Sequence, residues 1–485
     1  MLRKLVYLLM FLFIVSSAFP QETELPHQYI TVETVNLKYP VNAIDVRAIG
    51  IGNTQIAYGK TYNAMMYNPA LLGQKRFSIE FIGIQAGMPS ATYSAADYLS
   101  KHIDEFEEAI SLNQIWDGLD KLTQAGASDE QRLQALHEIQ DGLVFVNDLF
   151  LEVTGPGENP KTHGISLLPG ISGQIGNFGF SLYGFGQAGF MVRLSPTFES
   201  LLDIEIPSTL DDPVATARAA IQLTAALAPA VIGPGKFSDK VYPIAFYSSY
   251  FDIVGAVGYG KSIYKNLTIG ANLKIINRRF LLDRIAVDDY DEIISNAWDK
   301  FKSDITGVTC DLGAHYQFKF GTSVGATFQN IIPVKEIKKS IDTEFKFCRI
   351  SKYDITNDGQ IDSLKYETQE ITVTRPYALK VPFIMSFGVY HPLTKNWDIA
   401  FDWVDITEND SRYEETVDRI CLGTEYRFNT LKSALKITPR LGLSDQRITL
   451  GLGLNILKYF HIDGAYAYDR FVNENAYYAQ LKIGW

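Results

Sequence analysis

The sequence lacks the features of most metal-binding, disulfide-linked and nucleic-acid-binding chains. It has three cysteines, Cys310, Cys348 and Cys421, which lie far apart and match neither a metal-ligand spacing nor an even disulfide framework. Its 44 Lys and Arg residues are outnumbered by 55 Asp and Glu residues, giving a formal net charge of −11. Without a basic stripe, nucleic acid is not an expected partner. The motifs of serine hydrolases, zinc proteases and phosphate-binding loops are also missing, so we do not expect an enzyme.

Long apolar runs are scarce as well. Arg3 and Lys4 precede the apolar run Leu5–Val15, and the small residues Ser16, Ser17 and Ala18 follow it. This three-part layout predicts a secretory signal peptide over residues 1–18. The alternative, an N-terminal membrane helix, needs about 20 apolar residues, and no later run approaches that length. The chain is therefore either soluble after export or crosses a membrane as strands.

The second half of the chain alternates apolar and polar residues with period two. In 267–275 and 447–456, for example, every second residue is apolar, which is the signature of a strand. A water-soluble sandwich could show the same alternation. If the strands instead form a membrane barrel, the polar face lines the lumen. The candidate lumen-lining residues are Lys274, Asp311, His315, Asp398, Asp402, Glu425, Arg427, Arg440, His461 and Asp463.

Strand length, aromatic placement and loop length favour the barrel. Most runs have about 10–12 residues, which suits tilted membrane strands, and aromatic residues gather near their ends. Short and long connections largely alternate along the chain, as in a chain that zigzags through a membrane. We therefore predict an all-β fold, a transmembrane antiparallel barrel of about fourteen strands over 77–485. The predicted strands are 77–87, 163–174, 178–192, 250–261, 267–280, 305–319, 321–331, 380–391, 397–406, 417–428, 433–443, 446–457, 459–468 and 476–485.

A segment rich in small residues, Gly50–Gly73, precedes the first predicted strand. Wall side chains alone do not fill a barrel of this width, so another part of the chain must close it. Glycine and alanine permit tight turns near the wall, and Asn-Pro fixes a turn. We expect 19–76 to form a periplasmic segment and lumen hatch, and the alternative is an arm that plugs nothing. The candidate hatch residues are Gly50, Gly52, Asn68, Pro69 and Ala70.

The motifs Arg47–Gly52 and Tyr67–Leu72 resemble the N-terminal signature of the FadL-type outer-membrane transporter superfamily. This resemblance implies a hatch, a fourteen-stranded barrel and a place in the outer membrane of Gram-negative bacteria. The superfamily includes transporters of fatty acids and aromatic hydrocarbons, and the PorV-like barrels of the type IX secretion system. The C-terminal motifs Arg440–Leu443, Ile448–Leu454 and Asp463–Tyr468 are more similar to the PorV-like members.

Two insertions near 95–150 and 197–235 have helical rather than strand periodicity. Ser128 and Gln131 have the spacing of a capping box at the start of one helix. By the alternation of the loops, these helices lie on the outer side of the barrel. They either cap it by packing on each other or gather a hydrophobic ligand with their apolar faces.

A possible calcium loop lies in another long connection. Asp354, Asp358 and Asp362 stand at positions 1, 5 and 9 of the pattern, with Gly359 at position 6. Thr356 is a poor ligand, and Lys365 stands where a bidentate acid is common. The alternative is an Asn-Asp-Gly hairpin turn.

Three functions remain open from the sequence. The first is an outer-membrane barrel that binds or passes small hydrophobic compounds, such as fatty acids or hydrocarbons, by outer-loop capture and an N-terminal hatch. The alternative is a PorV-like secretion or surface-assembly component that binds partner proteins. A barrel-embedded hydrolase is the third, but no candidate nucleophile and base are visible. Membrane lipid is an expected partner in each case.

Overall fold

The structure is a computed structural model of the 485-residue chain, and it describes residues 45–484 with gaps. The gaps are 59–62, 75, 112, 125, 156–162, 194–197, 199–200, 203, 210–212, 233–243, 287–301, 333, 354–362, 410–414, 431–433, 458 and 470–473. The expected signal peptide, 1–18, lies outside the described residues.

The fold is a closed antiparallel barrel of fourteen strands, as expected from the sequence. Each strand pairs with its neighbours in chain order, and pairing of β12 with β14 and of β1 with β17 completes the ring. The short strand β13 (Phe428–Thr430) extends the line of β12 and pairs with β14. The strands of the ring are β1 Arg76–Pro89, β2 His163–Gly176, β3 Phe178–Arg193, β4 Ile244–Tyr264, β5 Leu267–Ala286, β6 Lys302–Gln317, β7 Ser323–Gln329, β10 Ile384–Pro392, β11 Trp397–Trp403, β12 Ile420–Tyr426, β14 Leu435–Ser444, β15 Arg447–Ile456, β16 Phe460–Asp469 and β17 Glu474–Gly484.

The wall has an apolar outside and a polar inside, because side chains alternate along each strand. On β5, Leu273 and Ile275 are exposed, whereas the alternate residues Asn272 and Lys274 are buried. The same parity holds on β15, where Leu450 is exposed and Thr449 is buried. Soluble monomers rarely expose a continuous apolar surface of this extent. The outer face is therefore built for an apolar environment.

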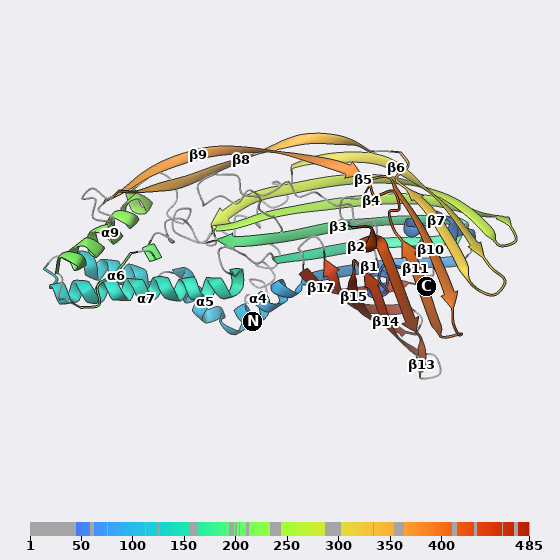
Figure 1. Ribbon diagram of the computed structural model, residues 1–485, viewed down its shortest axis with the longest axis horizontal. Helices are drawn as coiled ribbons and strands as arrows, with labels where there is room; N and C mark the ends of the chain where they lie inside the picture. The colour runs from blue at the N-terminus through green and yellow to red at the C-terminus, as the bar shows by residue number, and fades with distance from the viewer. Residues whose placement is uncertain are drawn as a thin grey trace.

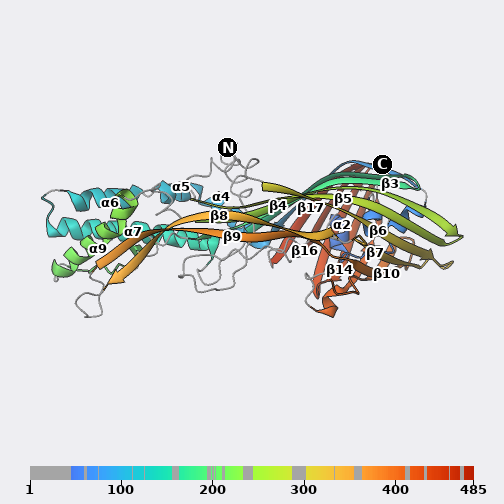
Figure 2. The same ribbon diagram turned by 90° about the horizontal axis from the view of Figure 1, so that it is seen from above.

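Two further parts extend from one end of the barrel (Figures 1 and 2). The hairpin of β8 (Val334–Tyr353) and β9 (Ser363–Val381) runs from the wall towards a group of helices. The helices are α4 Ser90–Lys101, α5 Ile103–Ser111, α6 Asn113–Thr123, α7 Asp129–Thr154 and α9 Pro213–Ile232.

These helices lie in the two predicted insertions, although the first group spans 90–154 rather than 95–150. The Ser128 side chain accepts a bond from the Gln131 N–H, and the Gln131 side chain accepts one from the Ser128 N–H, so the predicted capping box is confirmed. The apolar faces pack on each other around Leu136, Ile139 and Leu143 of α7. None of the helices in the described ranges is long and apolar enough to span a bilayer.

Candidate functional site: the inner segment and its wall

The described residues before β1, 45–58 and 63–74, lie against the inner side of the wall. This inner segment, residues 45–74, contains α2 (Val46–Gly50), α3 (Ala64–Tyr67) and the 3-10 helix η1 (Pro69–Gln74). Almost all of its described residues are buried. The Asp45 side chain accepts a hydrogen bond from the Arg47 N–H and so caps α2. The segment follows the wall from β17 and β16 round to β3 and β2.

Glycines on successive strands let the backbone of this segment touch the backbone of the wall. We call them the glycine girdle. A Cβ atom added at Gly442 would lie 2.5 Å from the carbonyl carbon of Ile51, and one added at Gly451 would lie 2.8 Å from the Cα of Gly50. Real Cβ atoms essentially never approach other atoms so closely. Close approach of two backbones is a recognised use of glycine within strands. The girdle consists of Gly451, Gly442, Gly423, Gly388, Gly325, Gly313, Gly270 and Gly260, while Gly258 and Gly179 lie against the side chains of Leu72 and Met65.

Several girdle glycines are direct partners across neighbouring strands. Gly423 pairs with Gly442, and Gly388 pairs with Gly325. Gly270 pairs with both Gly260 and Gly313. The glycines therefore form a nearly continuous line around the inside of the barrel, and the inner segment lies along this line. This line of glycines was not predicted from the sequence, although inward positions of successive strands carry the glycines.

Strand β11 contributes a carboxylate opposite the girdle glycine of β10. Asp402, which pairs with Gly388, accepts hydrogen bonds at Oδ2 from the N–H groups of Gln55 (2.6 Å) and Ile56 (2.9 Å). A carboxylate that accepts two backbone donors forms charge-assisted bonds, which are stronger than neutral ones. Asp402 thus holds the turn after α2 against the wall.

The Asn-Pro motif is a second anchor. The Asn68 amide donates to the carbonyl oxygens of Ile56 (3.0 Å) and Ala314 (3.1 Å), and its Oδ1 accepts from the Ala70 N–H (3.0 Å). Asn68 thus joins two parts of the inner segment to β6. Gly52, with φ of +64°, has the left-handed backbone that favours glycine, and its N–H donates to Thr449 Oγ1 at 3.1 Å. Pro69 and Ala70, which follow Asn68 in η1, are buried.

A cluster of charged groups surrounds α2. Arg47 lies 3.0 Å from Glu425 and stacks over the ring of Tyr58. The Tyr58 hydroxyl donates to Glu425 at 2.5 Å. Burial raises the pKa of Tyr58 well above its ordinary value, and Glu425 adds to this rise against the opposing effect of Arg47. Tyr58 therefore remains protonated and able to donate.

The remaining charges of the cluster are paired across the wall. Arg440 contacts Asp463 at 2.6 Å, and Arg427 pairs with Asp398. Lys482 Nζ contacts Asp45 Oδ1 at 2.7 Å, which ties the start of α2 to β17. Pairing of this kind offsets the cost of removing each charge from water.

The other candidate lumen residues lie on the inner face as well. Lys274 pairs with Asp311 at 2.7 Å and donates to Asn330, and all three are buried. His315 is buried in β6, whereas His461 is half-buried in β16. The candidate calcium ligands Asp354, Asp358 and Asp362 lie outside the described residues, so that site stays a prediction.

A fully buried ion pair on the inner face was not identified from the sequence. Arg278 contacts Asp252 through two bonds of 2.6 Å, and neither side chain is exposed. The two residues are cross-strand partners on β5 and β4. The signal was present, because Arg278 continues the polar face of Asn272 and Lys274 with period two.

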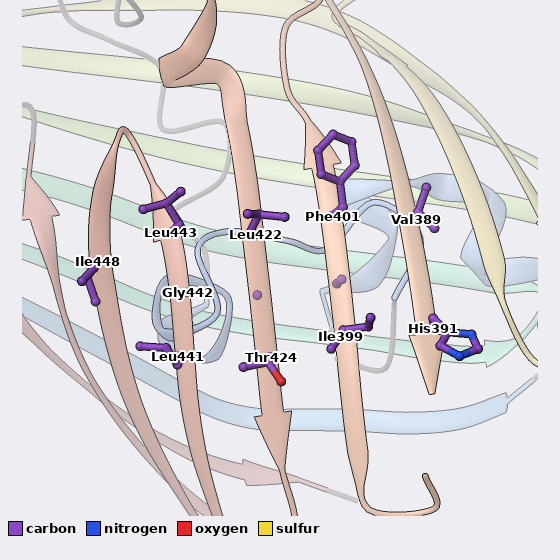
Figure 3. Close-up of a pocket in the computed structure, with 12 residues that line it drawn as sticks. Val389, His391, Ile399, Phe401, Leu422, Thr424, Leu441, Gly442, Leu443 and Ile448 are labelled. Carbon is purple, nitrogen blue, oxygen red and sulfur yellow. The ribbon is translucent and has the colours of Figure 1, made fainter. Parts of the chain in front are cut away.

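An apolar groove of about 520 Å³ lies on the outer side of the wall, where β10, β11, β12, β14 and β15 adjoin (Figure 3). Ile399, Leu422 and Leu441 line it with exposed side chains. Gly423 and Gly442 also line it, and these two residues contact Ile51 and Gly52 from the inner side. One layer of backbone therefore separates the groove from the inner segment.

These features define a class, a closed β-barrel with its N-terminal segment packed inside. The chain belongs to the family described as "F plasmid transfer operon, TraF, protein", whose model matches residues 65–403. The expected fourteen-stranded barrel is confirmed for the fold, while the family carries a description other than FadL-type. No curated protein sequence matches the chain.

Solved structures with similarity to the chain are distant in sequence. A TodX mutant, described as a monoaromatic hydrocarbon channel, is 11% identical, with coverage of 92% of this chain and 98% of that chain and a TM-score of 0.43. The Pseudomonas putida toluene transporter TodX is 12% identical, with coverage of 90% and 95% and a TM-score of 0.41. A Pseudomonas aeruginosa FadL homologue is 9% identical, with coverage of 91% and 98% and a TM-score of 0.39.

Proposed function

We propose that this protein is an outer-membrane barrel that binds small hydrophobic compounds and passes them across the wall, with the inner segment as its hatch. The observation that carries the proposal is the apolar groove over Gly423 and Gly442. It opens on the apolar outer face, where a compound dissolved in lipid would enter it. Pockets for small ligands are typically apolar and of about 300–1,000 Å³, which includes this groove.

The glycine girdle supports the hatch role of residues 45–74. The segment is attached by backbone contacts and by a limited set of polar anchors, chiefly Asp402, Asn68 and Lys482. These contacts, together with burial of apolar side chains such as Met65, Leu71 and Leu72, hold it in one position. Passage of a compound through the lumen requires the segment to leave part of the girdle.

A groove-filling variant tests the proposal. Leu422→Trp places a larger side chain in the groove, and Leu273→Trp, an equally exposed outward position on β5, is the matched control. With the protein in vesicles, we expect saturable binding of a fluorescent fatty acid to weaken in Leu422→Trp by about tenfold, or about 1.4 kcal/mol. Equal binding by both variants and the unchanged protein would refute the groove as the ligand site.

A second function, docking of other proteins, is favoured by the projecting parts. The β8–β9 hairpin and the helices extend well beyond the barrel (Figure 2), and the helices have their own closed apolar core. A self-contained core leaves their outer faces for a partner. The family description, which refers to a plasmid transfer operon, agrees with an assembly role. Deletion of residues 335–380 should abolish co-purification of a protein partner while leaving fatty-acid binding intact. Loss of both activities, or of neither, would contradict this function.

A further inference from the structure

A second cavity lies inside the barrel, next to the short connections. It has a volume of about 500 Å³. Its residues come from the start of β1, the end of β17, and the adjoining ends of β12, β14, β15 and β16, and α2 covers it on one side. The lining residues are Arg47, Tyr58, Arg76, Ser78, Glu425, Arg427, Lys436, Thr438, Arg440, Asn455, His461, Asp463 and Lys482.

Basic residues outnumber acidic ones around this cavity, in a protein that is acidic overall. Six arginines and lysines line the cavity, against two carboxylates, Glu425 and Asp463. Asp45, Asp398 and Glu80 interact with some of these bases from behind the lining. Even with those three included, the bases outnumber the acids by six to five. A positive potential in a cavity with low-dielectric walls concentrates anions.

Two basic groups of the lining have unused capacity. The Lys436 side chain is half-buried and makes neither an ion pair nor a hydrogen bond with the described part of the chain. Arg47 Nη1 is buried and lacks a hydrogen-bond partner among the described residues. Buried donors are normally paired, and a bound acceptor is one way to pair them.

We infer that this cavity binds a small anion of the phosphate class that enters from the side of the short connections. Guanidinium groups match phosphate with paired N–H donors, and a lysine adds a point charge. Ser78, Thr438 and Asn455 supply neutral donors around these bases. The cavity is separate from the apolar groove, so this inference does not depend on the hydrophobic ligand.

Isothermal titration of the full-length protein in detergent with inorganic phosphate, at constant ionic strength, tests the site. Lys436→Gln removes the unpaired charge, and Lys436→Arg retains it. Lys319→Gln, at an exposed position in a short connection of the same barrel end, is the matched control. Acetate serves as a singly charged comparison, and thermal unfolding of each variant verifies that it is folded.

We expect saturable phosphate binding that weakens about tenfold in Lys436→Gln, is largely retained in Lys436→Arg, and is unchanged in Lys319→Gln. Acetate should bind more weakly than phosphate. Absence of saturable binding, an equal loss in Lys319→Gln, no loss in Lys436→Gln, or equal affinity for acetate would overturn the inference. If Lys436→Gln does not fold, loss of phosphate binding in Lys436→Arg would overturn the inference.

Discussion

The contact between Gly442 and the inner segment offers a direct test of how the lumen is closed. In Gly442→Ala, the new Cβ would lie 2.5 Å from the Ile51 carbonyl carbon and 2.5 Å from Thr449 Oγ1, whereas ordinary contacts begin at 3.4 Å. The backbone nitrogen of Gly52 would lie closer still, so the segment itself must shift. Overpacking of this kind costs about 1–3 kcal/mol. Displacement also weakens the bond from the Gly52 N–H to Thr449, which contributes about 0.5–1.5 kcal/mol.

Together these losses weaken attachment of the segment by about 1.5–4.5 kcal/mol, which increases the displaced population roughly 10- to 2000-fold. We expect faster amide exchange in 45–58 and a higher single-channel conductance in planar bilayers. The control is Gly255→Ala on β4, where the new Cβ would meet only Leu182 Cδ1, at 4.0 Å. If Gly442→Ala and Gly255→Ala behave alike in both assays, the girdle does not position the segment.

Three other substitutions test separate parts of the molecule. Asp402→Ala leaves the Gln55 and Ile56 N–H groups without their acceptor, at about 1–3 kcal/mol each, so their amide exchange should accelerate; unchanged exchange would exclude an anchoring role. Arg278→Leu strands the buried Asp252 charge and should cost about 3–5 kcal/mol in thermal unfolding, whereas Arg278→Leu with Asp252→Leu should recover much of it; no recovery would contradict this account. Ser128→Ala should destabilise the start of α7 by about 0.5–2 kcal/mol, seen as local proteolysis with an unaltered barrel; protection equal to wild type would disprove the capping role.

The barrel was predictable because the alternation of apolar and polar residues and the lengths of the connections together define its architecture. On β5 and β15 the alternation identifies which side chains face outward, and the tight and long connections set the direction of each strand. Even the short connection at Ser444–Asp445, which breaks the alternation of loop lengths, is a real turn, with positive φ at Asp445 and Gln446. The capping box at Ser128 was equally visible, since its two residues are only three apart.

Long-range contacts were less accessible. The glycine girdle depends on which inward position of each strand lies at the level of the inner segment, and strand register cannot be derived from one strand alone. The partners of Arg47 and Lys482 lie hundreds of residues away in sequence. Alternation placed Asp402 and Glu425 on the inner face, but it could not show that backbone groups of 55–56 would meet Asp402.

The central claim is that the apolar face of each wall strand contacts lipid while the opposite face encloses the inner segment. Spin labels at positions 448, 449, 450, 452, 454 and 455 of β15, with Cys310, Cys348 and Cys421 replaced by alanine, test it most directly, because Gly451 and Gly453 leave no room for a side chain. In vesicles, the account predicts high collision rates with oxygen at 448, 450, 452 and 454, and low rates at 449 and 455. Equal rates along the strand, or greater access of a water-soluble nickel reagent to the even positions, would contradict it.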